Sequence, residues 1–455
     1  MAETNLLDAL VFVPVCDDVI PGHLMAAARL DLPAVVVTGG YMSLNRRAGA
    51  PIDPLQVASK HLNACKGGDI DPSEFGQIVD RRCRGSGACP VMGTANTLAA
   101  LAEALGMSPP GNAATPGPDS RLQRLAFEAG RQVVELHRRG LTPSQIMTPA
   151  AFENAVRVLM AIGGSTNGVL HLQAVAAEFD LELTPELFNR LNAETPLICD
   201  IVPGGSGAHY MADLDEAGGI PAVLKELEPL LDTTVLTVTG KTLARDLEGV
   251  RVLDRAVIRP LDDPLSPEGG LRFLRGSLAP NGCLVKTSAV PDTMLRHTGP
   301  ARIFTSEELA CDALADGSLV AGDVVVLRYT GPKGDPGMRL QQRFLWQLAA
   351  RGLHDRVAFV TDGRISGTNK GCAVTHVGPE AAEGGPLAFV EEGDRIEIDI
   401  PAGTIELAVP IEELARRGAA WRPPARSGRR KGYLDVYARL AKSADRGAAL
   451  DYDGE

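Results

Sequence analysis

Two cysteines stand in settings where a thiol can do chemistry. Residues 85–90 form a Gly-rich turn that carries Cys89 shortly before a predicted helix. A thiol near a helix N-terminus has a lowered pKa and can serve as a nucleophile or a metal ligand. Cys16, Asp17 and Asp18 follow an apolar run and pair one soft ligand with two hard ones, which suits iron, zinc or magnesium. The plainer interpretations are a buried cysteine in a tight turn and an acidic loop with an incidental cysteine.

Two further turns carry hydroxyl groups. Ser165 and Thr166 lie in a Gly-Gly-Ser-Thr-Asn turn, residues 163–167, between two predicted helices. Such a turn offers backbone N–H groups and hydroxyls to an anion, although a glycine C-cap followed by a Ser/Thr N-cap would look the same. A second turn, after a predicted strand, could present Ser366 as a base or nucleophile and Arg364 as a partner for a carboxylate, or could be a plain turn.

These residues need elements to position them, and the start of the chain has the pattern of a parallel α/β layer. Apolar residues 7–15 are followed by a predicted helix, 23–30, and a predicted buried strand, 33–38. Because ligands bind beyond the carboxyl ends of parallel strands, Cys16 falls where a site is expected. Further helices, the first opened by a Thr94 cap, are predicted over residues 94–105, 121–139 and 149–161.

The composition changes after the helical part. From Thr234 onward, short Val- and Ile-rich segments alternate with Gly, Pro and Asp turns, a pattern typical of a β-barrel or sandwich. These segments are TVLTVTG, VRVLDRAVIRP, GDVVVLRYTG, RVAFVTDG and DRIEIDIPAGTIELAV. We therefore expect an α/β domain over residues 1–237 and a β-rich domain with a tail over residues 238–455, with the boundary near Val238.

The overall composition limits the partners. The chain has 455 residues and a formal net charge of -12, which disfavours nucleic acid and anionic membrane surfaces as partners. No apolar run is long enough to span a membrane, and the N-terminus lacks the pattern of a signal peptide. Eight cysteines without a compact disulfide framework indicate a reduced, cytoplasmic setting.

Long stretches of the chain resemble the family of dihydroxy-acid, 6-phosphogluconate and pentonate dehydratases. The resemblance is carried by CDDVIPGHLMAAARLDLPAVVVTGG, GSGACPVMGTANTLAALAEALGMSPPG, AFENAVRVLMAIGGSTNGVLHLQAVA, GSLAPNGCLVK, VTDGRISGT and THVGPEAAEGGPLAFVEEGDRIEIDI, which together cover nearly the whole chain. It implies an N-terminal α/β domain with a parallel sheet, a C-terminal β-barrel domain and a homodimer.

The resemblance also implies a reaction. The family removes water from a 2,3-dihydroxy acid, and the enol product becomes a 2-keto acid. An iron of a 2Fe-2S or 4Fe-4S cluster binds the leaving hydroxyl, Mg²⁺ holds the carboxylate, and a serine alkoxide takes the proton. By position, Cys16 and Cys89 match cluster cysteines and Asp17 matches a Mg²⁺ ligand. Ser366 matches the base, and residues 163–167 match a loop beside the substrate.

The chain departs from the family pattern in three places. It begins late, without the segment that supplies another cluster cysteine and a Mg²⁺-binding aspartate. Asp18 replaces a lysine that binds Mg²⁺ when carbamylated, and Leu340 replaces a Mg²⁺-binding glutamate. Because lost ligands weaken a metal site, we expect an impaired Mg²⁺ site and an iron–sulfur cluster that is 2Fe-2S or altered. Arg339 is expected either to place a guanidinium where the ion would sit or to be a surface arginine.

One function and two alternatives follow from these features. We expect a divergent hydro-lyase that converts a small hydroxy or 2,3-dihydroxy acid into a 2-keto acid, with Ser366 as the base. Ser165, Thr166 and Arg364 are expected to bind the substrate. The alternatives are a half-site paralogue that needs a partner subunit, in a hetero-oligomer with a chain that supplies the missing segment, and a non-catalytic protein that only binds a hydroxy acid.

Overall fold

The computed structural model describes residues 2–47, 50–52, 61–368, 370–423 and 432–451. The chain forms two compact units, an N-terminal unit of Met1–Gly270 and a barrel unit of Leu271–Glu455. Each unit has its own secondary structure and core, and each is described by itself below.

The boundary between the units lies later in the chain than the predicted boundary near Val238. Val238 donates its N–H to the Gly106 carbonyl at 2.7 Å, and Gly270 donates to the Met160 carbonyl at 3.0 Å, so this segment belongs to the N-terminal unit. The stretches TVLTVTG and VRVLDRAVIRP form turns and isolated bridges there and are not barrel strands. Several of their apolar side chains, namely Val235, Val238, Val257 and Ile258, are buried in the N-terminal unit.

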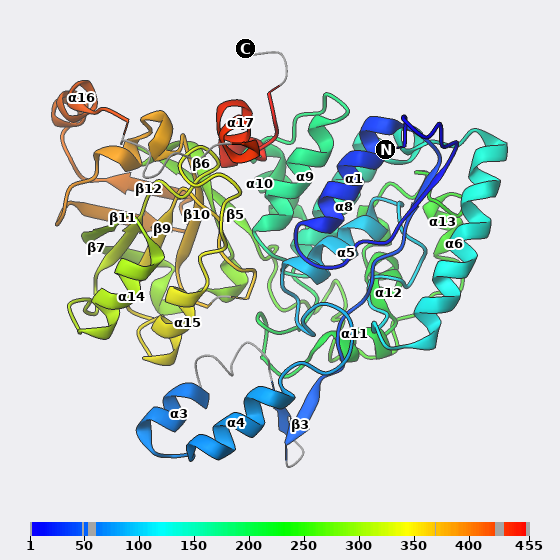
Figure 1. The fold of residues 1–455 in the computed structure, drawn as a ribbon, viewed down its shortest axis with the longest axis horizontal. Helices are drawn as coiled ribbons and strands as arrows, with labels where there is room; N and C mark the ends of the chain where they lie inside the picture. The colour runs from blue at the N-terminus through cyan, green and yellow to red at the C-terminus, as the bar shows by residue number, and fades with distance from the viewer. Residues whose placement is uncertain (1, 48–49, 53–60, 369, 424–431, 452–455) are drawn as a thin grey trace. The chain divides into compact units, whose positions relative to one another are not determined.

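The N-terminal unit begins with a β–α–β arrangement. Strand β1 (Leu10–Phe12) and strand β2 (Ala34–Val36) pair in parallel. Helix α1 (Val19–Leu30), which is labelled in Figure 1, connects them. This confirms the predicted α/β start, but the parallel sheet has two strands within the described residues and is small. Most of the regular secondary structure in this unit is therefore helical.

The helices of the N-terminal unit surround α5 (Thr94–Ala104), all of whose residues are buried. Helices α1, α8, α9 and α12 pack against α5, which explains why its sequence is rich in Ala and Leu. No helix in the described part of the chain is both long and apolar enough to cross a membrane. The other elements of this unit are β3 (Asn45–Arg47), β4 (Ala50–Ile52), α3 (Leu62–Gly67), α4 (Pro72–Arg81), α6 (Ser120–Arg139), α7 (Pro143–Ile146), α8 (Pro149–Ala161), α9 (Asn167–Ala177), α10 (Pro185–Glu194), α11 (Met211–Glu216), α12 (Gly219–Glu226) and α13 (Leu243–Asp246).

The barrel unit contains a closed barrel with the strand order β10-β6-β5-β12-β11-β7-β8-β9, which confirms the predicted C-terminal β-barrel. The barrel is mixed: β7, β8, β9 and β10 run parallel to one another, β5 pairs in parallel with β12, and the remaining pairs are antiparallel. The strands are β5 (Arg272–Gly276), β6 (Ala279–Val285), β7 (Arg296–Phe304), β8 (Val324–Leu327), β9 (Ala358–Thr361), β10 (Ala373–Gly378), β11 (Arg395–Asp399) and β12 (Thr404–Leu407). The helices are α14 (Glu307–Ala315), α15 (Arg343–Ala350), α16 (Ile411–Ala420) and α17 (Tyr433–Leu440).

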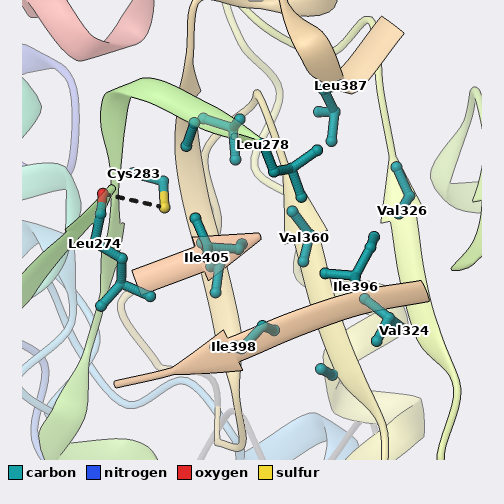
Figure 2. Close-up of a cluster of buried hydrophobic side chains, with 14 of the residues drawn as sticks. Leu274, Leu278, Cys283, Val324, Val326, Val360, Leu387, Ile396, Ile398 and Ile405 are labelled. Atoms are coloured by element: carbon teal, nitrogen blue, oxygen red, sulfur yellow. Dashed lines mark hydrogen bonds between the residues drawn. The ribbon is translucent and has the colours of Figure 1, made fainter. Parts of the chain in front are cut away.

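Alternation along the strands builds two cores in the barrel unit. Val324 and Val326 of β8 belong to the cluster in Figure 2, which also includes residues of β5, β6, β9, β11 and β12. Val325 and Leu327 belong to a second cluster, with Phe344 of α15. Because successive side chains of a strand point to opposite faces, β8 is apolar at every position.

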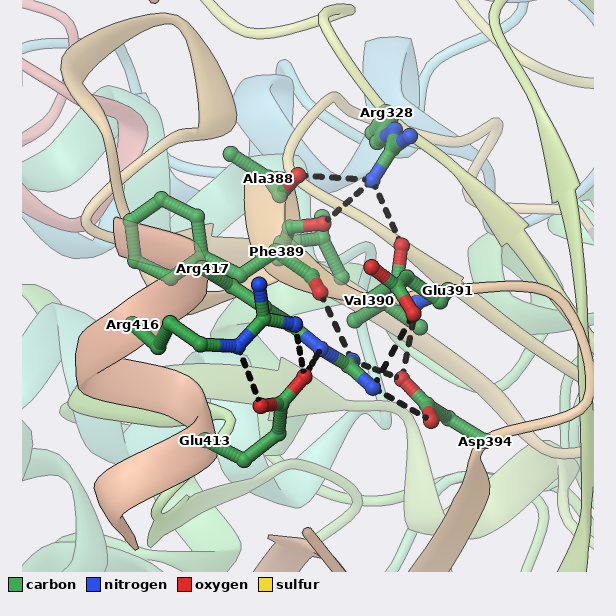
Figure 3. Close-up of polar contacts among 10 residues, drawn as sticks. Arg328, Ala388, Phe389, Val390, Glu391, Asp394, Glu413, Arg416 and Arg417 are labelled. Atoms are coloured by element: carbon green, nitrogen blue, oxygen red, sulfur yellow. Dashed lines mark hydrogen bonds and ion pairs between the residues drawn. The ribbon is translucent and has the colours of Figure 1, made fainter. Parts of the chain in front are cut away.

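A half-buried ion-pair cluster ties α16 to the barrel (Figure 3). Arg417 pairs with Asp394 at 2.6 Å and with Glu413 at 2.8 Å, and the Arg417 and Asp394 side chains are only 12% and 13% exposed. Nearby, the Arg328 guanidinium donates to the carbonyls of residues 388 and 390 at 2.8 and 2.9 Å. These contacts fix the segment that follows β10.

Candidate active site

Cys16 and Cys89 belong to two segments that flank the same stretch of backbone. The backbone of residues 39–40 donates a hydrogen bond of 2.9 Å to the Pro14 carbonyl and accepts one of 2.8 Å from the Ala88 N–H. Both cysteines therefore lie at the end of the small sheet to which the carboxyl ends of β1 and β2 point.

Cys16 has a left-handed backbone conformation and acidic neighbours. Its φ of 74° lies in the left-handed region, which is strained for a residue with a side chain and is often found at functional sites. The thiol lies 3.7 Å from the Asp17 carboxylate. Although the residue is exposed, partial burial of the sulfur and then the charges of Asp17 and Asp18 raise the pKa of the thiol. A nearby cation would reverse this effect, so the setting suits a metal ligand better than a free nucleophile.

Cys89 is half-buried in the turn before α5. Its carbonyl accepts a hydrogen bond of 2.7 Å from the Asn96 side chain, which donates equally to the Val91 carbonyl. Asn96 lies on the first turns of α5, so the helix fixes the conformation of the cysteine-bearing turn.

A histidine faces the acidic loop. His171 of α9 places its Nε2 3.7 Å from the Asp18 carboxylate, because α1 and α9 pack together. The His171 side chain is 12% exposed and that of Asp18 is 59% exposed. The apolar helix around His171 predicts a packed or capping histidine, and nothing in its spacing points to Asp18, which lies 153 positions earlier.

Ser165 is fully buried and held from several sides. Its hydroxyl lies 2.9 Å from the Thr94 hydroxyl and accepts the N–H of Asn167 at 3.2 Å. Its own N–H donates to the Thr97 hydroxyl at 3.0 Å. Thr94 is therefore not the cap that the sequence predicted, because the residue before α5 is Gly93 and the Thr94 hydroxyl binds Ser165.

Thr166 differs from its neighbour. It precedes the first residue of α9, yet its side chain makes no capping hydrogen bond. Its hydroxyl oxygen is buried and has no partner among the described residues, although the residue is only 1% exposed. A buried hydroxyl without a partner is rare and unfavourable, so it marks a position where a hydrogen bond to a ligand atom would be stabilising.

The metal donors of the N-terminal unit form an incomplete set. Within the described residues, no three His, Cys, Asp or Glu side chains lie close enough together to hold a metal ion. Iron–sulfur clusters usually take four protein ligands. Cys16 and Cys89 can supply two thiolates and Asp17 a carboxylate, but these residues alone do not complete a cluster site.

In the barrel unit, Ser366 lies in the turn that follows β9. It is 8% exposed, and its hydroxyl lies 2.8 Å from that of Thr368. The turn is anchored by Asp362, whose fully buried carboxylate accepts the N–H groups of Thr330 and Ala381 at 3.0 and 2.9 Å. Ser366 is thus a rigidly held hydroxyl that has little contact with solvent.

Arg364 is engaged with backbone carbonyls. Its guanidinium donates to the carbonyls of Met338 and Gly337, and its own carbonyl accepts the N–H of Gln341 at 3.0 Å. These bonds join the segment 337–341 to the turn that carries Ser366. Its predicted role as a substrate ligand is untested, and its bracing role was not apparent from the sequence.

The segment joined to this turn contains the departure from the family pattern. Leu340 is half-buried. Arg339 pairs with Asp335 at 2.9 Å, and its side chain is 70% exposed. Of the two interpretations of Arg339, the surface arginine agrees better with this exposure.

A buried lysine near Ser366 was missed by sequence reasoning. Lys286, directly after β6, is 3% exposed and donates to the Gly367 carbonyl at 3.2 Å. Burial lowers its pKa to about 7. Its only signal in the sequence is a lysine that closes the apolar stretch GCLVK.

Comparison with known proteins places both units in one family. Residues 1–246 match the dihydroxy-acid/6-phosphogluconate dehydratase N-terminal model, and residues 256–448 match the corresponding C-terminal model. A dihydroxy-acid dehydratase of Moorella thermoacetica is 49% identical over 455 residues, which cover 99% of this chain and 81% of that protein. Dihydroxy-acid dehydratases of Methanothrix thermoacetophila and Nitratidesulfovibrio vulgaris are 47% and 46% identical, over 99% and 98% of this chain and 81% of each relative. The chain therefore belongs to the dihydroxy-acid/6-phosphogluconate dehydratase family, which is a family of hydro-lyases.

Proposed function

We propose that this chain dehydrates a small 2,3-dihydroxy carboxylic acid to a 2-keto acid, with Ser366 as the base. The observation that carries the assignment is the buried Ser366 hydroxyl, held in a rigid turn at the end of a barrel strand. The names of the relatives support the substrate class, since each is a dihydroxy-acid dehydratase.

The proton to be removed lies on the carbon next to the carboxylate, where it is weakly acidic. Ser366, as its alkoxide, takes this proton and the hydroxyl of the neighbouring carbon departs as hydroxide. The proton then passes from Ser366 to the hydroxide, which gives water and restores the alkoxide. The enol that forms then rearranges to the 2-keto acid. A positioned base of this kind typically contributes a factor of about 10² to 10⁴ to the rate.

The substrate carboxylate is assigned to the turn before α9. The Thr166 hydroxyl is buried without a partner among the described residues, which supports its donation to an anionic oxygen. Ser165 holds the turn in place through Thr94 and Asn167. A carboxylate accepts hydrogen bonds from hydroxyls and backbone N–H groups at helix N-termini.

We assign Cys16 and Cys89 as two ligands of an iron–sulfur cluster and Asp17 as a metal ligand. Their shared position beyond the small sheet supports this assignment. We infer an altered Mg²⁺ site, because Leu340 offers no ligand atom and Arg339 is paired with Asp335.

The test is turnover by protein purified without oxygen. Iron and sulfide are measured first, and 2-keto acid formation is then followed with branched-chain dihydroxy acids, sugar acids and phosphorylated sugar acids, with and without Mg²⁺. We expect turnover of at least one substrate class and a homodimer by light scattering. Binding without turnover by protein that contains its cluster would contradict the proposal.

A matched pair of serine variants tests the base. Ser366→Ala should lower kcat by about 10² to 10⁴, whereas Ser318→Ala, at an exposed position on the same unit, should leave it unchanged. Equal activity of both variants would exclude Ser366 as the base.

A further inference from the structure

Lys286 is a buried amine without a buried countercharge. It follows β6 in the barrel unit and is 3% exposed, and no ion pair joins it to a carboxylate within the described residues. Burying an isolated ammonium is strongly unfavourable, so such a lysine prefers its uncharged form. A lysine kept at this position is therefore expected to do more than pack.

Within the described residues, the Lys286 amine makes one polar contact, and that contact is to the turn of the proposed base. Its Nζ donates to the Gly367 carbonyl at 3.2 Å, one residue after Ser366. The Ser366 hydroxyl lies 2.8 Å from the Thr368 hydroxyl. The amine therefore contacts the same three-residue segment, 366–368, that carries both hydroxyls.

The electrostatic surroundings of Lys286 favour proton exchange near neutral pH. Burial alone lowers its pKa to about 7, and no carboxylate raises it. The charged and titratable residues on the segments that pack around it are Arg272 on β5, His376 on β10, and Asp362, Arg364 and Lys370 beside the turn.

We propose that Lys286 and Ser366 form a serine–lysine pair in which the Lys286 amine takes the hydroxyl proton of Ser366. This inference rests on the proposed function, because it assigns the activation of that same base. The Ser366 O–H bond breaks and an N–H bond forms on Lys286, so a neutral pair becomes an alkoxide and an ammonium with no change in total charge. Lysine replaces histidine in this role in several unrelated serine enzymes.

Lys286 acts through Ser366 and is therefore a positioning residue for the reaction. Its uncharged form accepts the proton, and its charged form then stabilises the alkoxide that results. In the absence of substrate the pair should be competent only when Lys286 is uncharged. The activity should therefore fall as the pH drops through about 7.

The first test is chemical and needs neither cluster nor substrate. The protein is treated with methanesulfonyl fluoride, a small reagent for activated serines, and labelling is located by mass spectrometry from pH 5.5 to pH 9. Wild type should be labelled at Ser366, with a rate that rises with a midpoint near pH 7. Lys286→Met should lose this labelling at least tenfold, whereas Lys442→Met, at an exposed position, should match wild type.

Lys286→Arg separates proton transfer from simple hydrogen bonding. Arginine can still donate to the Gly367 carbonyl but cannot accept a proton, so this variant should also lose labelling. Thermal unfolding of each variant checks that the barrel is intact. Equal labelling of wild type and Lys286→Met, or no labelling of wild type at pH 9, would overturn the pair.

The second test uses the holoenzyme with its best dihydroxy acid. The kcat/KM of wild type should fall on the acid side of pH 7, and Lys286→Met should lose about 10² in kcat/KM together with this acid limb. An acid limb that persists unchanged in Lys286→Met would also overturn the pair. If Ser366 labelling depends on Lys286 but no dihydroxy acid is turned over, the proposed function fails and the serine–lysine pair stands.

Discussion

Replacing Thr166 by valine should make the protein more stable and less active. The Thr166 hydroxyl is buried and has no partner among the described residues, and an unsatisfied buried polar group costs about 1–3 kcal/mol. Valine has nearly the same shape without the hydroxyl. Since the Thr166 side chain does not cap α9, no helix contact is lost, and the free energy of unfolding should rise by about 1–3 kcal/mol.

The same change should impair the reaction if the hydroxyl binds the substrate carboxylate. A hydrogen bond to a charged group contributes about 1.5–3 kcal/mol, which corresponds to a fall in kcat/KM of roughly 10- to 150-fold. Ser165→Ala is the matched control one position earlier. Its hydroxyl is bonded to Thr94 and Asn167, so its loss should lower the free energy of unfolding by about 1–2 kcal/mol.

Unfolding in urea, followed by far-UV circular dichroism, measures both variants. Fluorescence is unsuitable for this purpose, because both tryptophans, Trp346 and Trp421, lie in the barrel unit. A Thr166→Val protein that is less stable than wild type would show that the hydroxyl is bonded in the folded state. An unchanged kcat/KM would show that it does not touch the substrate.

Three further predictions concern the metal ligands, the pH dependence of stability and the barrel. Cys89→Ala should lower bound iron and sulfide after anaerobic reconstitution, whereas Cys311→Ala, in the second core of the barrel unit, should not. Burial raises the pKa of Glu103 from 4.5 to about 7, so between these pH values this carboxyl is protonated in the folded protein and ionised in the unfolded protein. The free energy of unfolding should therefore fall as the pH rises from 4.5 to 7, by up to about 3 kcal/mol. Urea titrations of Glu103→Gln should not show this fall. Arg417→Met should lower the stability of the barrel unit by about 3–5 kcal/mol, because it leaves the Asp394 carboxylate without its arginine partner. Tryptophan fluorescence in urea measures this loss. The double variant Arg417→Met, Asp394→Asn should recover part of it.

Local sequence patterns predicted helices and strands well where segments that are adjacent in the sequence pack against each other. The β–α–β start and the barrel followed from apolar runs bounded by turn residues. The two compact units divide after Gly270, later than Val238, because residues such as Val238 are apolar enough for a strand but are bonded to the N-terminal unit through Gly106. Hydrophobicity alone does not say against which core a segment will pack.

The site was only partly predictable for a similar reason. Cys16 and Ser366 could be chosen because each lies in the loop that follows a strand. The buried state of Lys286 depends on closure of the barrel, which brings it to Gly367, 81 positions later. The contact of Thr94 with Ser165 spans 71 positions. Such pairings have no local signal, so the local pattern predicted the common role of a helix cap for Thr94.

The hydrogen bonds made by Arg364 couple two loops of the barrel unit, so that a movement of one loop is transmitted to the other. The guanidinium holds the carbonyls of residues 337–338, while the backbone of the same residue holds Gln341. Remodelling the Leu340 region, for instance to introduce a metal-binding carboxylate, would therefore also displace Ser366, which lies two positions after Arg364. Any redesign of this site must therefore change both loops together. Arg364→Lys would be a poor substitution, because lysine lacks the planar guanidinium that donates to two carbonyls at once.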